Sequence, residues 1–168
     1  KKASYQELVC WILNYFLGDY SKEEIERAVK LAYSQENFST EKITPLRRLD
    51  DSTYIMELWH GPTAAFKDLA LQILPYLLVE AMKKNEDDKE IVILVATSGD
   101  TGKAALEGFK DVEGVQIIVY YPEDGVSKIQ EDQMLTTGGN NTEVVDVKGN
   151  FDDCQNAVKQ IFADKRIN

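Results

Sequence analysis

The sequence predicts an α/β fold: an open, mainly parallel sheet with flanking helices, preceded by a helical N-terminal segment. Strand-like and helix-like runs alternate three times from residue 91 onward, which is typical of right-handed βαβ crossovers. The run IVILVAT at 91–97 is continuously apolar and β-branched, like a parallel strand covered on both faces. Residues 1–50 instead place apolar residues at helical spacing. We therefore expect a helical segment at 1–50 and an α/β domain at 51–168.

Two helices are predicted within the first fifty residues. Ser4 to Glu7 and Ser21 to Glu24 both have the Ser-x-x-Glu spacing of a capping box, in which the hydroxyl and the carboxylate satisfy free amides at a helix start. Apolar residues then recur at helical spacing and predict one buried face for each helix. These faces consist of Leu8, Ile12, Tyr15 and Phe16 in the first helix, and of Ile25, Ala28, Val29 and Ala32 in the second.

The predicted α/β domain begins with a short strand candidate, TYIMEL at 53–58, which follows a Pro-containing connector at 43–49. After the strand at 91–97, the runs VQIIVYY and TEVVDV predict further strands at 115–121 and 142–147. A helix is expected after each of these three strands. The first of these helices is marked by the apolar residues Ala104, Ala105, Leu106 and Phe109. The second begins at Ser127, with Gln130 as its box partner, and ends at Gly138 and Gly139. The third begins at Asp152 and Asp153 and continues with the apolar positions Cys154, Ala157, Val158, Ile161 and Phe162.

Composition excludes several classes of partner. The chain has 19 basic and 29 acidic residues and a net charge of −10, so nucleic acid and anionic membranes are poor partners. It has no run of 18 apolar residues. One histidine and two distant cysteines, Cys10 and Cys154, are too few for a metal cluster and favour a reducing, cytoplasmic setting.

The loop after the strand at 91–97 carries residues suited to binding an anion. Thr97, Ser98 and Thr101 offer hydroxyls, and Gly99 and Gly102 would let the backbone approach a ligand closely. In an open α/β sheet, ligands bind beyond the carboxyl ends of the strands, and the free amides of a new helix carry partial positive charge. The loop therefore favours a carboxylate or a phosphate.

Better-known phosphate loops are excluded by spacing. The segment 96–109, ATSGDTGKAALEGF, contains neither GxxxxGK[ST] nor GxGxxG. The loop could also be only a well-capped strand-to-helix turn. Asp100 would repel a bound anion unless it faces a hydroxyl or a cation, and its plainer role is helix capping.

Lys67 is the second candidate site residue. It stands between Phe66 and Asp68, where a Gly- and Pro-containing loop gives way to an apolar run. A surface lysine with its charge in water is one interpretation. The other is a Schiff-base lysine, because an amine desolvated by apolar neighbours is a better nucleophile. His60 is likewise either a hydrogen-bonded loop residue or a catalyst. For Asp68, the plainer interpretation is that it places negative charge in the first turn of a helix.

The segments HGPTAAFKDLA (60–70) and ATSGDTGKAALEGF (96–109) closely resemble the two signature segments of the threonine synthase family. These are pyridoxal-phosphate enzymes of the tryptophan-synthase-β-like fold, also called fold type II. The segment at 121–155 is similar to the same family in register, so the resemblance covers most of residues 50–165.

The resemblance implies a role for each candidate residue. Lys67 would hold pyridoxal 5'-phosphate covalently and later shuttle protons, with Phe66 and Asp68 setting its orientation. Ser98, Gly99, Asp100, Thr101 and Gly102 would embrace the substrate carboxylate. Asp100 stands where the wider superfamily has asparagine, although aspartate is usual in this branch, and the resemblance leaves open how Asp100 contacts the 3-hydroxyl of the cofactor.

The reaction implied by the resemblance converts O-phospho-L-homoserine and water to L-threonine and phosphate. Two alternatives remain open: another lyase of the same fold, such as a threonine dehydratase or cysteine synthase relative, and a non-catalytic module that binds small anions. In the family, later segments supply the loop for the cofactor phosphate and the hydroxyl that faces the pyridine nitrogen. We therefore expect these 168 residues to be a fragment that binds the cofactor poorly and does not turn over.

Overall fold

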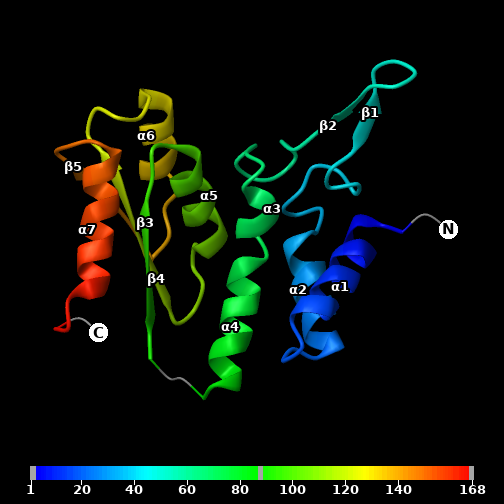
Figure 1. Ribbon diagram of the computed structural model, residues 1–168, viewed down its shortest axis with the longest axis horizontal. Helices are drawn as coiled ribbons and strands as arrows, with labels where there is room; N and C mark the ends of the chain where they lie inside the picture. Colours follow the sequence, from blue (N-terminus) through cyan, green and yellow to red (C-terminus); the bar gives the residue numbers. More distant parts are fainter. Residues whose placement is uncertain (1–2, 87–88, 167–168) are drawn as a thin grey trace. The chain divides into compact units, whose positions relative to one another are not determined.

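The computed structural model describes residues 3–86 and 89–166. The chain forms two compact units, and the division falls between residues 87 and 88. Figure 1 shows helices and a small two-stranded ribbon in the first unit, and a sheet with helices in the second. Each unit is described by itself.

In the described residues 3–86, the first unit contains four helices. The predicted capping boxes are both present: Ser4 Oγ accepts from Glu7 N at 3.1 Å, and Ser21 Oγ accepts from the N of Glu24 at 3.2 Å. In turn, the carboxylate of Glu7 accepts from Ser4 N at 2.7 Å, and that of Glu24 accepts from Ser21 N at 2.6 Å. The helices are α1 (Tyr5–Phe16), α2 (Lys22–Ala32), α3 (Asp68–Leu71) and α4 (Leu74–Lys84).

The core of the first unit confirms one predicted helix face and corrects the other. All four residues predicted to be buried on α2 are buried, and they pack with Tyr33, Phe38, Ile43 and Ile73. On α1 the predicted face is wrong, because Leu8, Ile12, Tyr15 and Phe16 are exposed, whereas Tyr5, Val9 and Leu13 lie against the core. The helix is apolar on two sides, so spacing alone does not decide which side is buried.

The predicted strand at 53–58 forms, but outside the parallel sheet. Strand β2 (Tyr54–Met56) pairs antiparallel with β1 (Leu46–Arg48), a segment expected to be only a connector. The turn between them is closed locally: Asp50 Oδ1 accepts from Ser52 N at 2.9 Å and from Thr53 N at 2.8 Å. This Asx-type turn brings the two short segments together as a hairpin.

The second unit confirms the predicted parallel sheet. Its strand order is β3-β4-β5, and both pairings are parallel. In Figure 1, α5 and α6 lie to one side of this sheet and α7 to the other, and both α5 and α7 contact β3 and β4. Ser127 and Gln130 form the predicted capping box of α6. The elements are β3 (Ile91–Ala96), α5 (Asp100–Phe109), β4 (Val115–Pro122), α6 (Lys128–Leu135), β5 (Thr142–Val147) and α7 (Phe151–Ala163).

The compact units differ from the predicted division at residue 50. Residues 51–86 belong with the helices of the first unit, because α3 and α4 complete their core. Ile73 is buried among the residues of α2. Tyr33 Oη donates to the carbonyl of Leu69 at 2.6 Å, and Tyr20 Oη donates to that of Leu77 at 2.9 Å. Lys67 therefore lies in the helical unit, and the loop at 97–102 lies in the sheet unit.

Within residues 3–86 and 89–166, none of the helices has the length and apolar character needed to cross a membrane.

Tyr121 on β4 should make the stability of the second unit sensitive to alkaline pH. Its hydroxyl donates to Glu131 Oε1 at 2.9 Å, and burial, then this bond and the charge of Glu131, raise the pKa of Tyr121 to about 12. An unfolded tyrosine ionises near pH 10, roughly. The stabilisation is therefore fully present below that pH and is lost as the pH rises toward the folded pKa.

We expect Tyr121→Phe to flatten the fall in unfolding free energy above about pH 10, where the unfolded tyrosine ionises. The measurement is urea unfolding at a series of pH values for both proteins. An equal slope in the two proteins would contradict the role given to Tyr121.

Candidate active site

Lys67 is presented by a tight loop immediately before α3. The side chain is half-buried, and its Nζ lies 4.5 Å from the centroid of the Phe66 ring, which is within the range of a cation–π contact. The Phe66 ring is itself 60% exposed, so the apolar enclosure expected around this lysine is incomplete. Among the described residues, the amine has no ion-pair partner. It is therefore accessible to a ligand.

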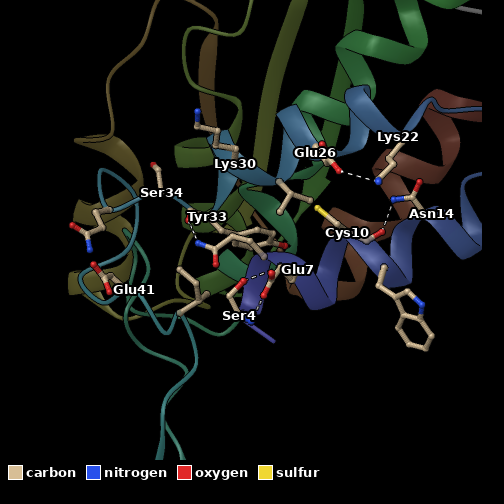
Figure 2. Close-up of a pocket in the computed structure, with 15 residues that line it drawn as sticks. Ser4, Glu7, Cys10, Asn14, Lys22, Glu26, Lys30, Tyr33, Ser34 and Glu41 are labelled. Carbon is tan, nitrogen blue, oxygen red and sulfur yellow. Dashed lines mark hydrogen bonds and ion pairs between the residues drawn. The ribbon is translucent and has the colours of Figure 1, made fainter. Parts of the chain in front are cut away.

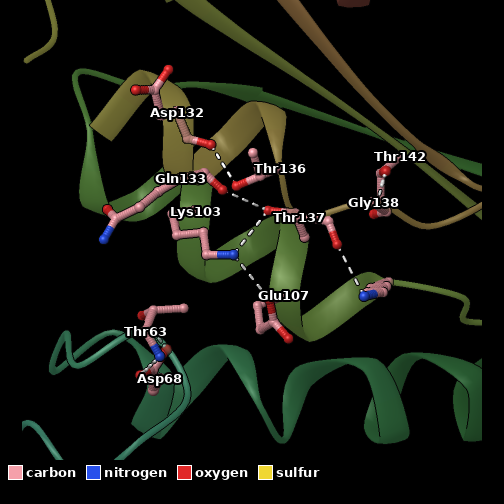
Figure 3. Close-up of polar contacts among 11 residues, drawn as sticks. Thr63, Asp68, Lys103, Glu107, Asp132, Gln133, Thr136, Thr137, Gly138 and Thr142 are labelled. Carbon is pink, nitrogen blue, oxygen red and sulfur yellow. Dashed lines mark hydrogen bonds and ion pairs between the residues drawn. The ribbon is translucent and has the colours of Figure 1, made fainter. Parts of the chain in front are cut away.

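Asp68 fixes the loop that leads to Lys67. Its side chain is only 1% exposed. Oδ2 accepts from Thr63 N at 2.9 Å, and Oδ1 accepts from Thr63 Oγ1 at 2.6 Å; Figure 3 shows these two residues together. A Cβ added to Gly61 would lie 2.5 Å from Asp68 Oδ2, so this position needs glycine. Spacing alone did not identify Thr63 or Gly61 as partners of Asp68.

His60 is a hydrogen-bonded loop residue. Its Nδ1 lies 2.9 Å from Ser39 Oγ, and its Nε2 lies 2.8 Å from Glu57 Oε2. The carbonyl of His60 also accepts from Ser39 N at 3.0 Å. Because both ring nitrogens have partners, the histidine joins two segments of the first unit, which favours the structural interpretation of the two that the sequence left open.

Thr97 shapes the candidate anion loop from inside. It is buried, and its Oγ1 accepts from Gly99 N at 3.1 Å and from Gly102 N at 2.9 Å. The same hydroxyl donates to the Gly99 carbonyl at 3.1 Å. The expectation that Thr97 offers its hydroxyl to a ligand is therefore wrong, because the loop itself uses that group.

Both loop glycines face protein. Gly99 has φ +148°, and a Cβ there would lie 2.4 Å from Gln130 Nε2. A Cβ on Gly102 would lie 2.5 Å from Thr97 Cγ2 and 2.9 Å from both Met134 Sδ and Val119 Cγ1. Close approach to a ligand was the expected reason for these glycines; the structure instead gives close packing of the loop on its own unit.

We expect Gly102→Ala to destabilise the second unit by about 1–3 kcal/mol, the usual cost of overpacking a filled core. The measurement is urea unfolding. Gly18→Ala is the matched control, since a Cβ at Gly18 meets nothing within 4 Å, and it should change the unfolding free energy little. Equal effects of the two substitutions would contradict the packing role of Gly102.

The outer side of the loop can accept an anion. Ser98, Asp100 and Thr101 are exposed, and α5 begins at Asp100. Within the described part of the chain, the amides of Asp100 and Thr101 donate no hydrogen bond to another residue. Two exposed hydroxyl residues thus lie at the positive end of a ten-residue helix.

Asp100 has a partner that the sequence did not indicate. Gln130 Nε2 donates to Asp100 Oδ1 at 3.0 Å, across a separation of 30 residues. The sequence indicates Gln130 only as the capping-box partner of Ser127 in its own helix. The side chain of Asp100 is therefore oriented by a neutral amide from α6.

Lys103, which directly follows Gly102, makes an ion pair and a hydrogen bond within its own unit. Its Nζ lies 3.0 Å from Glu107 Oε2 and 2.9 Å from Thr137 Oγ1, as Figure 3 shows. Lys110 Nζ donates to the carbonyl of Thr137 at 2.9 Å. These bonds fasten α5 to the end of α6, in agreement with the absence of a phosphate-loop sequence at Lys103.

A separate groove of about 1080 Å³ runs along α1 and α2 in the first unit. Figure 2 shows Cys10, Lys30 and Tyr33 among the residues that line it. None of the predicted site residues lines this groove. Across the described residues, no three His, Cys, Asp or Glu side chains are grouped to hold a metal ion.

Comparisons with known proteins agree on one family. The family described as "Pyridoxal-phosphate dependent enzyme" matches residues 20–167. A threonine synthase from Pseudomonas aeruginosa is 40% identical over 162 residues, which cover 96% of this chain and 34% of the relative. A threonine synthase from Eremothecium gossypii is 37% identical over 177 residues, with coverage of 98% and 34%.

A solved structure gives the same result. The crystal structure of pyridoxal-phosphate-bound threonine synthase from Brucella melitensis is similar to this chain with a TM-score of 0.88 at 36% identity. That similarity covers 99% of this chain and 35% of the solved one. The chain thus spans about a third of the length of the curated relatives it matches.

The family match extends over most of the chain and includes both Lys67 and the loop at 98–102. The same segments carry the sequence resemblance and the accessible amine and hydroxyls described above. The chain therefore belongs to the family of pyridoxal-phosphate dependent enzymes.

Proposed function

We propose that the protein containing this chain is a threonine synthase, which converts O-phospho-L-homoserine and water to L-threonine and phosphate with pyridoxal 5'-phosphate. The observation that carries the proposal is the Lys67 amine, which has no ion-pair partner among the described residues. The residue is half-exposed, and the loop that carries it is held by the two hydrogen bonds between Asp68 and Thr63. The similarity to proteins named threonine synthase supports this choice of reaction.

The residues present fit the covalent attachment of the cofactor. An accessible primary amine can condense with the aldehyde of pyridoxal phosphate, and the Phe66 ring beside Lys67 restricts the positions of that amine. The bound cofactor supplies an electron sink for carbanion chemistry. Lys67, once released as a neutral amine, would take the proton from the α-carbon and move protons at the β- and γ-carbons.

The loop at the start of α5 would bind the substrate carboxylate. Ser98 and Thr101 would donate from their hydroxyls, and the amides of Asp100 and Thr101, at the start of α5, would add two further donors. Gly99 and Gly102 allow the turn that presents these groups, because both pack against side chains of their own unit. Asp100 would place its carboxylate toward a hydrogen-bond donor of the cofactor.

The overall reaction balances without an oxidant or a reductant. The γ-carbon exchanges its phosphate for a hydrogen, the β-carbon exchanges a hydrogen for the hydroxyl of water, and the leaving phosphate takes the remaining proton of water.

We further infer a cytoplasmic location for this protein, for which the two free cysteines are the support.

The test uses the full-length protein. It is mixed with pyridoxal phosphate and reduced with borohydride, and the labelled peptide is mapped; a second sample is given O-phospho-L-homoserine, and phosphate and threonine are measured. A label on Lys67 with both products is the expected result.

The other outcomes separate the alternatives. A label on Lys67 without phosphate release, but with 2-oxobutanoate formed from threonine, would overturn the proposal in favour of a dehydratase. Binding of small anions without any label would overturn it in favour of a non-catalytic anion-binding module.

A further inference from the structure

Gln130, in the first turn of α6, joins two parts of the second unit through one side-chain amide. Its Oε1 accepts from Ser127 N at 3.2 Å and from Ser127 Oγ at 3.0 Å. Its Nε2 donates to Asp100 Oδ1 at 3.0 Å. A Cβ added at Gly99 would lie 2.4 Å from the same Nε2, so the backbone of the candidate anion loop lies directly against this amide.

The orientation of the amide follows from chemistry. The backbone N of Ser127 can only donate, so the oxygen of Gln130 must face it, and the NH₂ group must face Asp100. One carboxylate oxygen of Asp100 is thereby occupied. The side chain of Asp100 is exposed, which leaves Oδ2 able to accept from another donor.

We propose that Gln130 is a positioning residue for Asp100: it holds Oδ1 so that Oδ2 accepts from a hydroxyl or an ammonium group of the ligand bound at the start of α5. This inference rests on the proposed function, in which that ligand is the cofactor with its substrate. It also gives the start of α6 a second purpose, because the backbone N of Ser127 fixes the amide that orients Asp100.

The decisive variant is Gln130→Glu in the full-length protein. Glutamate serves as the box partner of serine at two other helices of this chain, where the carboxylates of Glu7 and Glu24 accept at 2.7 and 2.6 Å. The cap of α6 should therefore survive. The donor to Asp100 is replaced by a second carboxylate oxygen, and like charges at hydrogen-bond distance repel.

We expect Gln130→Glu to weaken the binding of pyridoxal phosphate by about tenfold or more, since a hydrogen bond to a charged group is lost. The measurement is the dissociation constant from an absorbance titration. The double variant Asp100→Asn with Gln130→Glu should recover most of that loss, because the amide of an asparagine can donate to the new carboxylate and still offer its oxygen to the ligand.

Ser127→Ala is the matched control. It removes the hydroxyl, which accepts from Gln130 N and donates to Gln130 Oε1, but keeps the backbone N that orients the side-chain amide of Gln130. It should lower the denaturation midpoint while the dissociation constant changes by less than about threefold, because the donor to Asp100 remains. If this control weakened cofactor binding as much as Gln130→Glu, the effect would come from the helix start, and the positioning role would be wrong.

The contact is also tested without cofactor. In the cofactor-free protein, the side-chain NH₂ signal of Gln130 in an NMR spectrum should shift when Asp100 is replaced by alanine. Normal cofactor affinity in Gln130→Glu, with Lys67 still labelled by borohydride, would overturn the positioning role and leave the proposed function standing. Failure of the unchanged protein to bind the cofactor would overturn both.

Discussion

Replacing Lys67 with alanine is expected to abolish the covalent attachment of pyridoxal phosphate and to lower turnover of O-phospho-L-homoserine by roughly 10³-fold or more, as for the loss of a nucleophile that also transfers protons. The reason is that the amine at this position is accessible and free of ion pairs to other described residues. The measurements are peptide mapping after borohydride reduction and the rate of phosphate release.

One further variant separates the nucleophilicity of Lys67 from its charge, and a second serves as a control at another lysine. Lys67→Arg keeps a positive charge beside the Phe66 ring but cannot condense with the aldehyde, so it should be as inactive as Lys67→Ala. Lys83→Ala removes an exposed lysine from α4 in the same unit and should leave both measurements unchanged. A label that persists in Lys67→Ala, on any other lysine, would exclude Lys67 as the attachment residue.

Asp68→Asn is expected to destabilise the first unit by about 2–3 kcal/mol and to slow the labelling of Lys67. Asparagine can accept from Thr63 N with its oxygen and donate to Thr63 Oγ1 with its NH₂ group, where the carboxylate now accepts from both at 2.9 and 2.6 Å. Both bonds then lose the charge of the carboxylate, and charge-assisted hydrogen bonds are the stronger ones. Urea unfolding measures the first effect, and the time course of borohydride labelling measures the second.

The control variants for Asp68 follow from the same contacts. Thr63→Ala keeps the backbone donor and removes the hydroxyl, so it should cost less, about 1–2 kcal/mol. Asp19→Asn changes an exposed carboxylate in the same unit and should change the unfolding free energy little. An unchanged labelling rate in a destabilised Asp68→Asn protein would mean that the hydrogen bonds between Asp68 and Thr63 stabilise the fold without positioning Lys67.

The sequence alone determined the features that depend on neighbouring residues. The capping boxes at Ser4, Ser21 and Ser127 form as predicted, because each partner lies three residues away. The three parallel strands form where β-branched runs occur, because β-branched side chains fit the pleated backbone of a strand. Local pattern and family resemblance also predict Lys67 and the loop at 98–102 as the site, and this stays a prediction.

The tertiary structure alone decided which side of a local feature is used. Helix α1 has two apolar sides, and only the packing of α2 determined that Val9 and Leu13 lie against the core while Tyr15 and Phe16 are exposed. The same holds for residues 51–86, which join the helical unit because Ile73 fills its core. Spacing describes a helix surface but not the partner that covers it.

Hydrogen bonds between distant residues were equally beyond the sequence. Thr97 and Ser98 are both hydroxyl residues of one loop, yet the structure uses the first internally and leaves the second exposed. The contact of Gln130 with Asp100 spans 30 residues and depends on the placement of α6 beside α5. The sequence therefore determined which chemical groups this protein carries, whereas only the folded chain decided which of them are already bonded and which remain available to a ligand, because that choice depends on neighbours that only packing brings together.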